Sequence, residues 1–207
     1  MSPADLVRQH RALYNPSWKH PAVVEVPVLS FLMVDGRGAP ESEVYQEAVQ
    51  AMYGTAYTLK FSLRNADAER DFKVGPLEGL WWSDLERPGL DDLRADREAW
   101  NWTLMTAVPD GVTAAEAAAA AEQAARKRRP SVPLEVRFER FEEGLAAQLL
   151  HIGPYSEEWP TIERLHTWVA GQGYELHGRH HEIYLSDPRR TAPERLKTVV
   201  RHPVREA

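Results

Sequence analysis

The spacing of apolar residues in the first half of the chain predicts strands around one long helix. Residues 22–34 form an apolar, β-branched run, which predicts a single buried strand ended by a glycine-rich turn. Residues 41–63 instead carry apolar side chains at intervals of about 3.6 positions, which predicts an amphipathic helix. Short apolar runs at 77–82 and 100–106 predict two further strands.

Shorter segments join these elements. Residues 3–13 predict a short amphipathic helix, and residues 72–74 predict a strand or one arm of a hairpin. The acidic stretch 83–97 contains Pro88 followed by Gly89, which indicates a connecting loop with at most one helical turn.

A helix is predicted between this half and a second half that repeats the same order of elements. Thr113 followed by Glu116 is the signature of a capping box, so a helix is expected over 114–129. The elements predicted after it are a strand-rich stretch over 136–151 with a turn at 142–144, a helix over 157–170 with Ser156 as N-cap, and strands over 179–185 and 196–204.

Each half therefore has the order strand, helix, strand, strand. This order predicts a single α+β domain over residues 1–207, built as a pseudo-twofold duplication of one strand-helix-strand-strand unit. The first half would span about 22–110 and the second about 134–204. Glu78 and Glu182 lie in corresponding strands, so a ligand cleft between the halves would contain carboxylates and aromatic rings.

Strand 179–185 carries the densest set of candidate functional groups. Side chains alternate between the two faces of a strand, so His180, Glu182 and Tyr184 are predicted to share one face. His181 and Ile183 would lie on the opposite face. One face of this strand is therefore titratable and aromatic.

Composition excludes several classes of protein. The chain has 207 residues, of which 43% are hydrophobic and 27% charged, and no apolar run approaches the roughly 18 residues of a membrane span. The first residues lack the features of a secretory signal. The net charge of −6 argues against nucleic acid as the main partner, because phosphate binding requires a basic surface. The sequence has no cysteine, which excludes a disulfide framework, and we expect a cytoplasmic protein.

Aromatic residues change this picture of an ordinary globular protein. Seven Trp and seven Tyr are many for this length. Most should lie in the core, but a surplus of rings is also typical of a site for a flat hydrophobic small molecule.

Five stretches, taken in order, carry the pattern of a known family. They are residues 31–38, 56–61, 77–82, 151–155, and 181–188 with the tail 196–204. Together they resemble the GyrI-like small-molecule-binding domain proteins, in the stand-alone branch that lacks a DNA-binding segment. The resemblance covers nearly the whole chain.

The resemblance implies a pseudo-twofold fold with a ligand cleft and a central buried glutamate, at the position of Glu182. Relatives fused to DNA-binding regions sense lipophilic cationic drugs. Some stand-alone relatives resemble hydrolases that open the cyclopropane ring of DNA-alkylating natural products of the yatakemycin and CC-1065 class. The resemblance therefore implies detoxification of hydrophobic electrophiles by hydrolysis. Two alternatives stay open: a module that sequesters lipophilic or cationic drugs, and an interaction protein that modulates a topoisomerase.

The residues are compatible with such chemistry. A strained cyclopropane conjugated to a dienone requires an oriented water and stabilisation of the oxyanion that forms on the carbonyl. Glu182 is the candidate general base, and the candidate hydroxyl donors are Tyr184, Tyr53 and Tyr57. Candidate ligand contacts are Glu78, Trp81, Trp82, Trp100, Trp102, His180 and Tyr155, although a strand tryptophan more often lies in the core.

Other kinds of site receive little support. The group His177, His180, His181 and Glu182 has the residue types of a zinc site, but strand alternation separates its members, so we expect no metal and no cofactor. His151 before Gly-Pro-Tyr is a second candidate base, and a strand-end role explains it equally well. The sequence contains neither a phosphate-binding glycine loop nor a nucleophile elbow.

Overall fold

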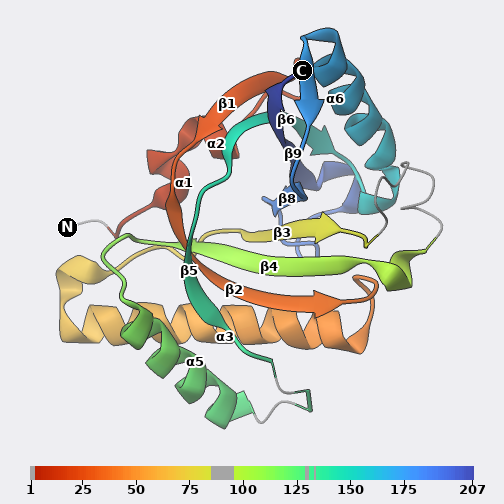
Figure 1. Cartoon of the computed structure of the whole chain (residues 1–207). Helices are drawn as coiled ribbons and strands as arrows, with labels where there is room; N and C mark the ends of the chain where they lie inside the picture. Colours follow the sequence, from red (N-terminus) through yellow and green to blue (C-terminus); the bar gives the residue numbers. More distant parts are fainter. Residues whose placement is uncertain (1–2, 85–95, 129–130, 133) are drawn as a thin grey trace. The chain divides into compact units, whose positions relative to one another are not determined.

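The computed structural model describes residues 3–84, 96–128, 131–132 and 134–207 (Figure 1). The chain divides into two compact units, and each is discontinuous in sequence. Unit 1 comprises residues 1–6, 29–75 and 79–141, and unit 2 comprises residues 7–28, 76–78 and 142–207. Residues 85–95, most of the predicted loop 83–97, lie outside the described residues, as does position 129 at the predicted helix end.

Unit 1 is an antiparallel sheet covered by two helices (Figure 1). Its strands are β2 (Leu29–Arg37), β4 (Asn101–Val108), β5 (Arg137–Phe141) and most of β3 (Leu77–Trp82), and β2 pairs with both β4 and β5. Helix α3 (Glu43–Ala66) packs on β2 and β4, and α5 (Ala114–Arg128) packs on α3 and β5. Short 3-10 helices cover Ala68–Arg70 and Arg97–Ala99.

Local sequence explains both helices of unit 1. Ser42 caps α3 by accepting a hydrogen bond from the Tyr45 amide at 3.3 Å. The capping box before α5 is confirmed: the Glu116 amide donates to Thr113 Oγ1 at 3.2 Å, and the Thr113 amide donates to Glu116 Oε2 at 2.9 Å. The buried face of α5 consists of alanines, which allow close packing against α3: Ala117, Ala120 and Ala124.

Unit 2 consists of antiparallel strands and one long helix (Figure 1). Its strand order is β1 (Ala22–Val26), β6 (Gly144–Ile152), β9 (Lys197–Glu206) and β8 (His180–Tyr184), and β7 (Tyr174–Leu176) pairs with the end of β9. Helix α6 (Trp159–Gly171) packs against β6, β7 and β9. The unit also contains α2 (Arg11–Tyr14) and most of α1 (Leu6–Gln9), with 3-10 helices over Tyr155–Glu157 and Pro193–Arg195.

The prediction of one strand over residues 22–34 is wrong, because the run contains two strands. Pro27 has no amide hydrogen for the ladder, and β1 ends just before it while β2 begins at Leu29. Strand β1 pairs with β6 in unit 2, whereas β2 pairs with β4 in unit 1. An apolar run that appears uniform in the sequence thus supplies one strand to each unit.

Two helix boundaries also differ from the prediction. Helix α6 begins at Trp159 rather than at residue 157, with Glu158 as its N-cap and Pro160 in its first turn. Ser156 lies in the preceding 3-10 helix and is therefore not the cap. The predicted N-terminal helix is divided into α1 and α2 by His10.

The predicted α+β class is confirmed, and the strands are distributed differently from two continuous halves. The predicted halves covered residues 22–110 and 134–204. In the structure, β1 belongs to the unit of the later strands and β5 to the unit of the earlier ones. Each unit is therefore completed by a strand from the other end of the chain.

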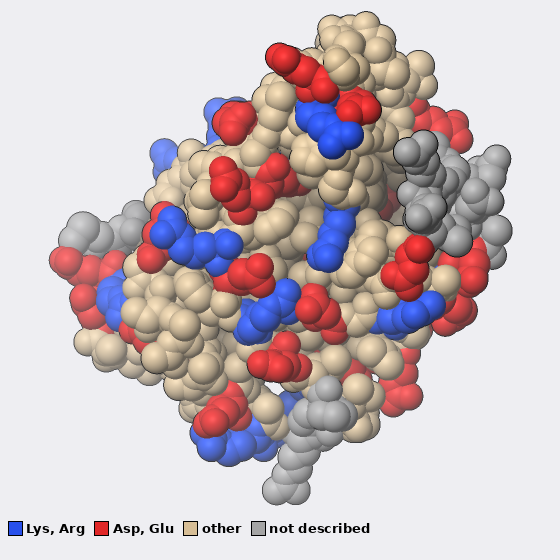
Figure 2. Space-filling model, in the orientation of Figure 1, with Lys and Arg blue, Asp and Glu red and all other residues tan. Residues whose placement is uncertain are grey.

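The surface in view has mixed charge. Figure 2 shows Lys and Arg side chains interspersed with Asp and Glu side chains over one face. Among the described helices, none has the length and apolar character that crossing a bilayer requires.

Candidate functional site

Strand β8 places different chemistry on its two faces, as the alternation predicts. His181 and Ile183 are buried, while His180, Glu182 and Tyr184 are partly exposed. The register with β9 pairs His181 with Arg201, and the alternation of β9 then brings His202 to the face of His180. Each face of β8 therefore carries its own cluster of polar side chains.

The partly exposed face holds a positioned carboxylate. The Tyr184 hydroxyl donates to Glu182 Oε2 at 2.7 Å, and His180 Nε2 lies 3.2 Å from Glu182 Oε1. The side chains of His180 and Glu182 are each 16% exposed. The ring of Tyr155, which is exposed, meets the ring of Tyr184 edge to face at 5.7 Å. The structure thus brings together Glu182, Tyr184, His180 and Tyr155.

A second carboxyl group, that of Glu158, interacts with the charge of Glu182. Glu158, the N-cap of α6, is only 4% exposed, and its Oε1 has no hydrogen-bond partner among the described residues. Burial raises the pKa of Glu158 well above its usual range, and the charge of Glu182 raises it further. A buried carboxyl group with a raised pKa beside a second carboxylate is a candidate general acid.

The opposite face of the sheet contains a buried ionic network. His181 is 1% exposed and lies between two carboxylates, with Nδ1 2.9 Å from Glu143 Oε1 and Nε2 3.0 Å from Glu78 Oε2. The guanidinium of Arg201 donates to Glu143 Oε2 at 3.0 Å and to the Leu13 carbonyl at 2.7 Å. Every charge in this group has a partner, as burial requires.

The pKa values in this network follow from burial and pairing. Burial alone would lower the pKa of His181, but Glu143 and Glu78 outweigh it and raise that pKa to about 9. Burial would raise the pKa of Glu143, but His181 and Arg201 lower it to about 2. The pKa of Tyr14, which donates to Glu78 Oε1 at 2.9 Å, is raised well above 10 by burial and by Glu78. These pKa shifts agree with ion pairs of Glu143 with His181 and Arg201 in the core.

Glu78 therefore lies in the buried ionic network, whereas the sequence predicts it as a ligand contact. Its side chain is 1% exposed, and its two carboxylate oxygens interact with Tyr14 and His181. His151 is likewise engaged: its Nδ1 lies 2.9 Å from Thr161 Oγ1 and its Nε2 lies 3.3 Å from the Pro154 carbonyl oxygen. We therefore assign Glu78 and His151 to the core of unit 2.

The four candidate tryptophans belong to unit 1, where Trp81, Trp100 and Trp102 share an aromatic cluster with Tyr45. Trp102 has no exposed surface, and its indole donates to the Gly38 carbonyl at 3.1 Å. Trp81 is 8% exposed, stacks on Tyr45 at 5.8 Å and meets Trp100 at 5.5 Å. Trp102 and Trp81 thus form core packing here. Trp82 and Trp100 are partly exposed, and ligand contact by them stays a prediction.

Tyr53 and Tyr57, the predicted hydroxyl donors of the first helix, lie on the surface of α3. Their rings stack at 6.5 Å, and Tyr57 stacks in turn on Phe61 at 6.3 Å. Tyr57 is 46% exposed. A role in oxyanion stabilisation stays a prediction for both residues.

Sequence reasoning missed several residues of these groups. Glu143 lies in the predicted turn over 142–144, and Glu158 lies at the start of the helix predicted over 157–170. His166 of α6 and His202 of β9 are distant in sequence from His180, so no local pattern connects the three. No local motif identifies any of these residues; the nearest signal is Arg201, a charged residue inside the predicted strand 196–204.

The α+β fold is that of a small-molecule-binding domain family. The sequence model of the GyrI-like small molecule binding domain matches residues 19–205. The chain belongs to this family.

Solved structures of close similarity agree with this membership. An uncharacterized conserved protein from Listeria innocua is 41% identical with a TM-score of 0.87, and the match covers 98% of this chain and 100% of that one. Two structures described as hydrolases from Listeria innocua are 39% and 38% identical, with TM-scores of 0.83 and 0.80. These matches cover 99% and 98% of this chain and 100% of each of those chains. Among curated proteins, none matches the chain.

Proposed function

We propose that this protein binds flat hydrophobic small molecules and hydrolyses an electrophilic one, with Glu182 as general base. The observation that carries the proposal is the geometry at Glu182, whose two oxygens are held by Tyr184 at 2.7 Å and His180 at 3.2 Å. A carboxylate fixed in this way can orient a water molecule. The description of two relatives at 38% and 39% identity as hydrolases supports an enzymatic function.

The proposed substrate is a cyclopropane conjugated to a dienone. Glu182 removes a proton from water, and the water oxygen bonds to the unsubstituted ring carbon. The bond between that carbon and the ring carbon that the cyclopropane shares with the dienone breaks. Its electron pair moves through the dienone to the carbonyl oxygen. Glu158, whose pKa burial raises, supplies a proton to that oxygen and is reprotonated through solvent from Glu182. The product is the substrate plus one water.

The other groups act by position in this scheme. Tyr184 already donates its hydroxyl hydrogen to Glu182, so it orients the base rather than the substrate carbonyl. The exposed ring of Tyr155, which meets Tyr184 edge to face, offers an apolar surface beside the carboxylate.

A second function is favoured by the same pair of rings. A carboxylate beside two tyrosine rings also suits a lipophilic cation, which the protein would sequester without chemistry. In that case Glu182 provides charge and not basicity. The two functions therefore differ in what the carboxylate of Glu182 does for binding.

Mass spectrometry distinguishes them. A cyclopropane-bearing alkylator incubated with the wild-type protein should gain the mass of one water, and Glu182→Gln should remove this product while a neutral ligand still binds. Glu163→Gln, the same change at an exposed position on α6, should behave as wild type. Glu158→Gln should slow the reaction, because an amide cannot supply the proton. Absence of product, with cation binding that depends on Glu182, would establish the sequestering function instead.

A further inference from the structure

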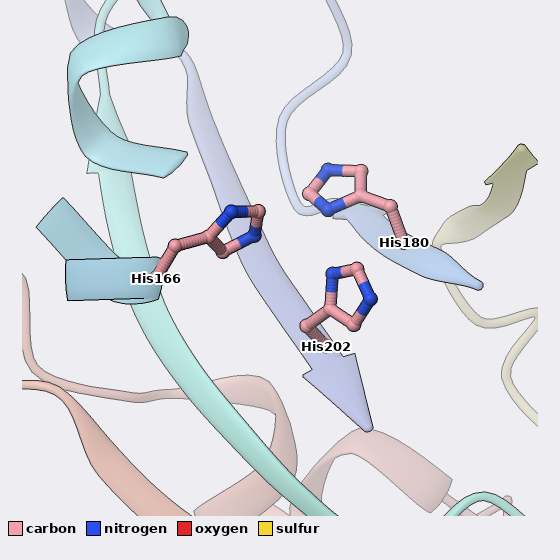
Figure 3. A group of neighbouring side chains, drawn as sticks. All are labelled: His166, His180 and His202. Atoms are coloured by element: carbon pink, nitrogen blue, oxygen red, sulfur yellow. The ribbon is translucent and has the colours of Figure 1, made fainter. Parts of the chain in front are cut away.

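Three imidazole rings from three elements of unit 2 face one another (Figure 3). They belong to His166 of α6, His180 of β8 and His202 of β9. One ring nitrogen of each lies within 4.8 Å of a ring nitrogen of the other two. The ring of His202 lies 5.2 Å from that of His166 and 5.8 Å from that of His180, between centroids. This group differs from the set considered from the sequence, since His181 lies on the opposite face.

The three rings share an unsatisfied hydrogen-bonding capacity. His166 Nε2, His180 Nδ1 and His202 Nδ1 are buried, and none has a hydrogen-bond partner within the described part of the chain. A buried polar nitrogen without a partner costs about 1–3 kcal/mol, and here three occur in one cluster. Three unpaired nitrogens in one cluster are explained more simply by one shared ligand than by three separate unsatisfied hydrogen bonds.

The second nitrogen of His180 has the partner that metal-binding histidines usually have. Its Nε2 lies 3.2 Å from Glu182 Oε1, and Glu182 is itself fixed by the Tyr184 hydroxyl. An ionised carboxylate only accepts hydrogen bonds, so Nε2 carries the hydrogen and the lone pair is on Nδ1. A histidine that donates to a carboxylate through one nitrogen and presents the other to a metal is a recurrent arrangement.

From this geometry we propose that His166, His180 and His202 bind a divalent transition-metal ion, of which Zn²⁺ is the best-fitting class. Three imidazoles form a common zinc ligand set and leave a fourth position open. Zinc–nitrogen distances of roughly 2.0–2.1 Å separate tetrahedral ligands by about 3.4 Å, so the rings need only a small closure. The proposal goes beyond the proposed function, in which Glu182 is the base and no metal takes part.

The environment favours the form of histidine that binds metals. Burial and, to a smaller extent, the neighbouring His180 lower the pKa of His166 to about 4. Burial also lowers the pKa of His202 well below its usual range, as do His180 and His166, and Glu143 opposes this only in part. Both shifts favour the neutral imidazole, which is the form that binds metal ions.

Metal binding is measured directly, without substrate. The full chain, treated with EDTA and exchanged into chelator-free buffer, is titrated with Zn²⁺ by calorimetry and with Co²⁺ by visible absorption. One ion per chain is expected. His166→Gln, His180→Gln and His202→Gln should each weaken the Zn²⁺ Kd by at least roughly 100-fold, and Glu182→Gln by roughly 10–100-fold through loss of the carboxylate partner. His20→Ala, an exposed histidine of the same unit, should leave the Kd unchanged.

A second measurement does not depend on the folding of variants. X-ray absorption of the wild-type Co²⁺ or Zn²⁺ complex should show three imidazole nitrogens in the first coordination shell. Binding without saturation at one ion per chain, or a shell with fewer than three imidazoles, would overturn the proposal. Turnover of a cyclopropane substrate by the EDTA-treated protein tests the proposed function separately, because that scheme requires no metal.

Discussion

Tyr184 donates its hydroxyl hydrogen to Glu182 Oε2 at 2.7 Å, from two positions further along the same strand. The contact exists because side chains at alternate strand positions share one face. Its effect is to restrict the orientation of the carboxylate that we propose as base.

Tyr184→Phe should therefore lower the rate of water addition and leave the affinity for a neutral ligand nearly unchanged. A hydrogen bond to a charged group contributes about 1.5–3 kcal/mol, so the rate should fall roughly 10–100-fold. Single-turnover kinetics and binding are measured on the same preparation. Tyr174→Phe on β7 is the matched control. A rate loss in Tyr57→Phe without one in Tyr184→Phe would move the functional hydroxyl to α3.

Glu143→Gln should destabilise the protein by about 3–5 kcal/mol at pH 7, because it leaves Arg201 and His181 buried with one carboxylate fewer. Glu142→Gln, at the adjacent exposed position, should have little effect. Urea unfolding monitored by tryptophan fluorescence gives both values.

The same contribution should depend on pH in a defined direction. The folded-state pKa of Glu143 is about 2, below the ordinary 4.5, so its stabilisation is complete above pH 4.5 and is lost as pH falls toward 2. The difference in unfolding free energy between wild type and Glu143→Gln should therefore shrink between pH 5 and pH 3. A constant difference over this interval would contradict the prediction, because the charge of Glu143 would then make no contribution to stability.

Gly36→Ala should destabilise unit 1, because Gly36 pairs across the strands with Trp102 and a methyl group there would overlap the indole ring. Overpacking of this kind costs about 1–3 kcal/mol. Gly111→Ala, where no atom lies within 4 Å of the added carbon, should change stability by less than about 0.5 kcal/mol. Thermal unfolding compares the two, and equal midpoints would mean that the Trp102 ring moves freely.

The sequence determined the local structure where a periodic pattern was strong. The 3.6-residue spacing and the Thr113–Glu116 box located α3 and α5, because helix periodicity and capping depend on residues a few positions apart. Alternation likewise placed His180, Glu182 and Tyr184 on one face of β8, since that relationship is internal to the strand. The family pattern was also a property of the sequence alone, and the match over residues 19–205 confirms it.

The tertiary structure decided which strands pair and which side chains meet. Strand β1 joined β6, and β5 joined β2, and neither pairing is specified by the local sequence of the strands. Glu143 reached His181, 38 positions away, and Arg201, 58 positions away, through the register of β8 on β9 and the position of the preceding turn. The meeting of His166 with His180 and His202 depends on how α6 packs on that sheet. Long-range contacts of this kind are set by register and helix packing, which no local periodicity in the sequence encodes.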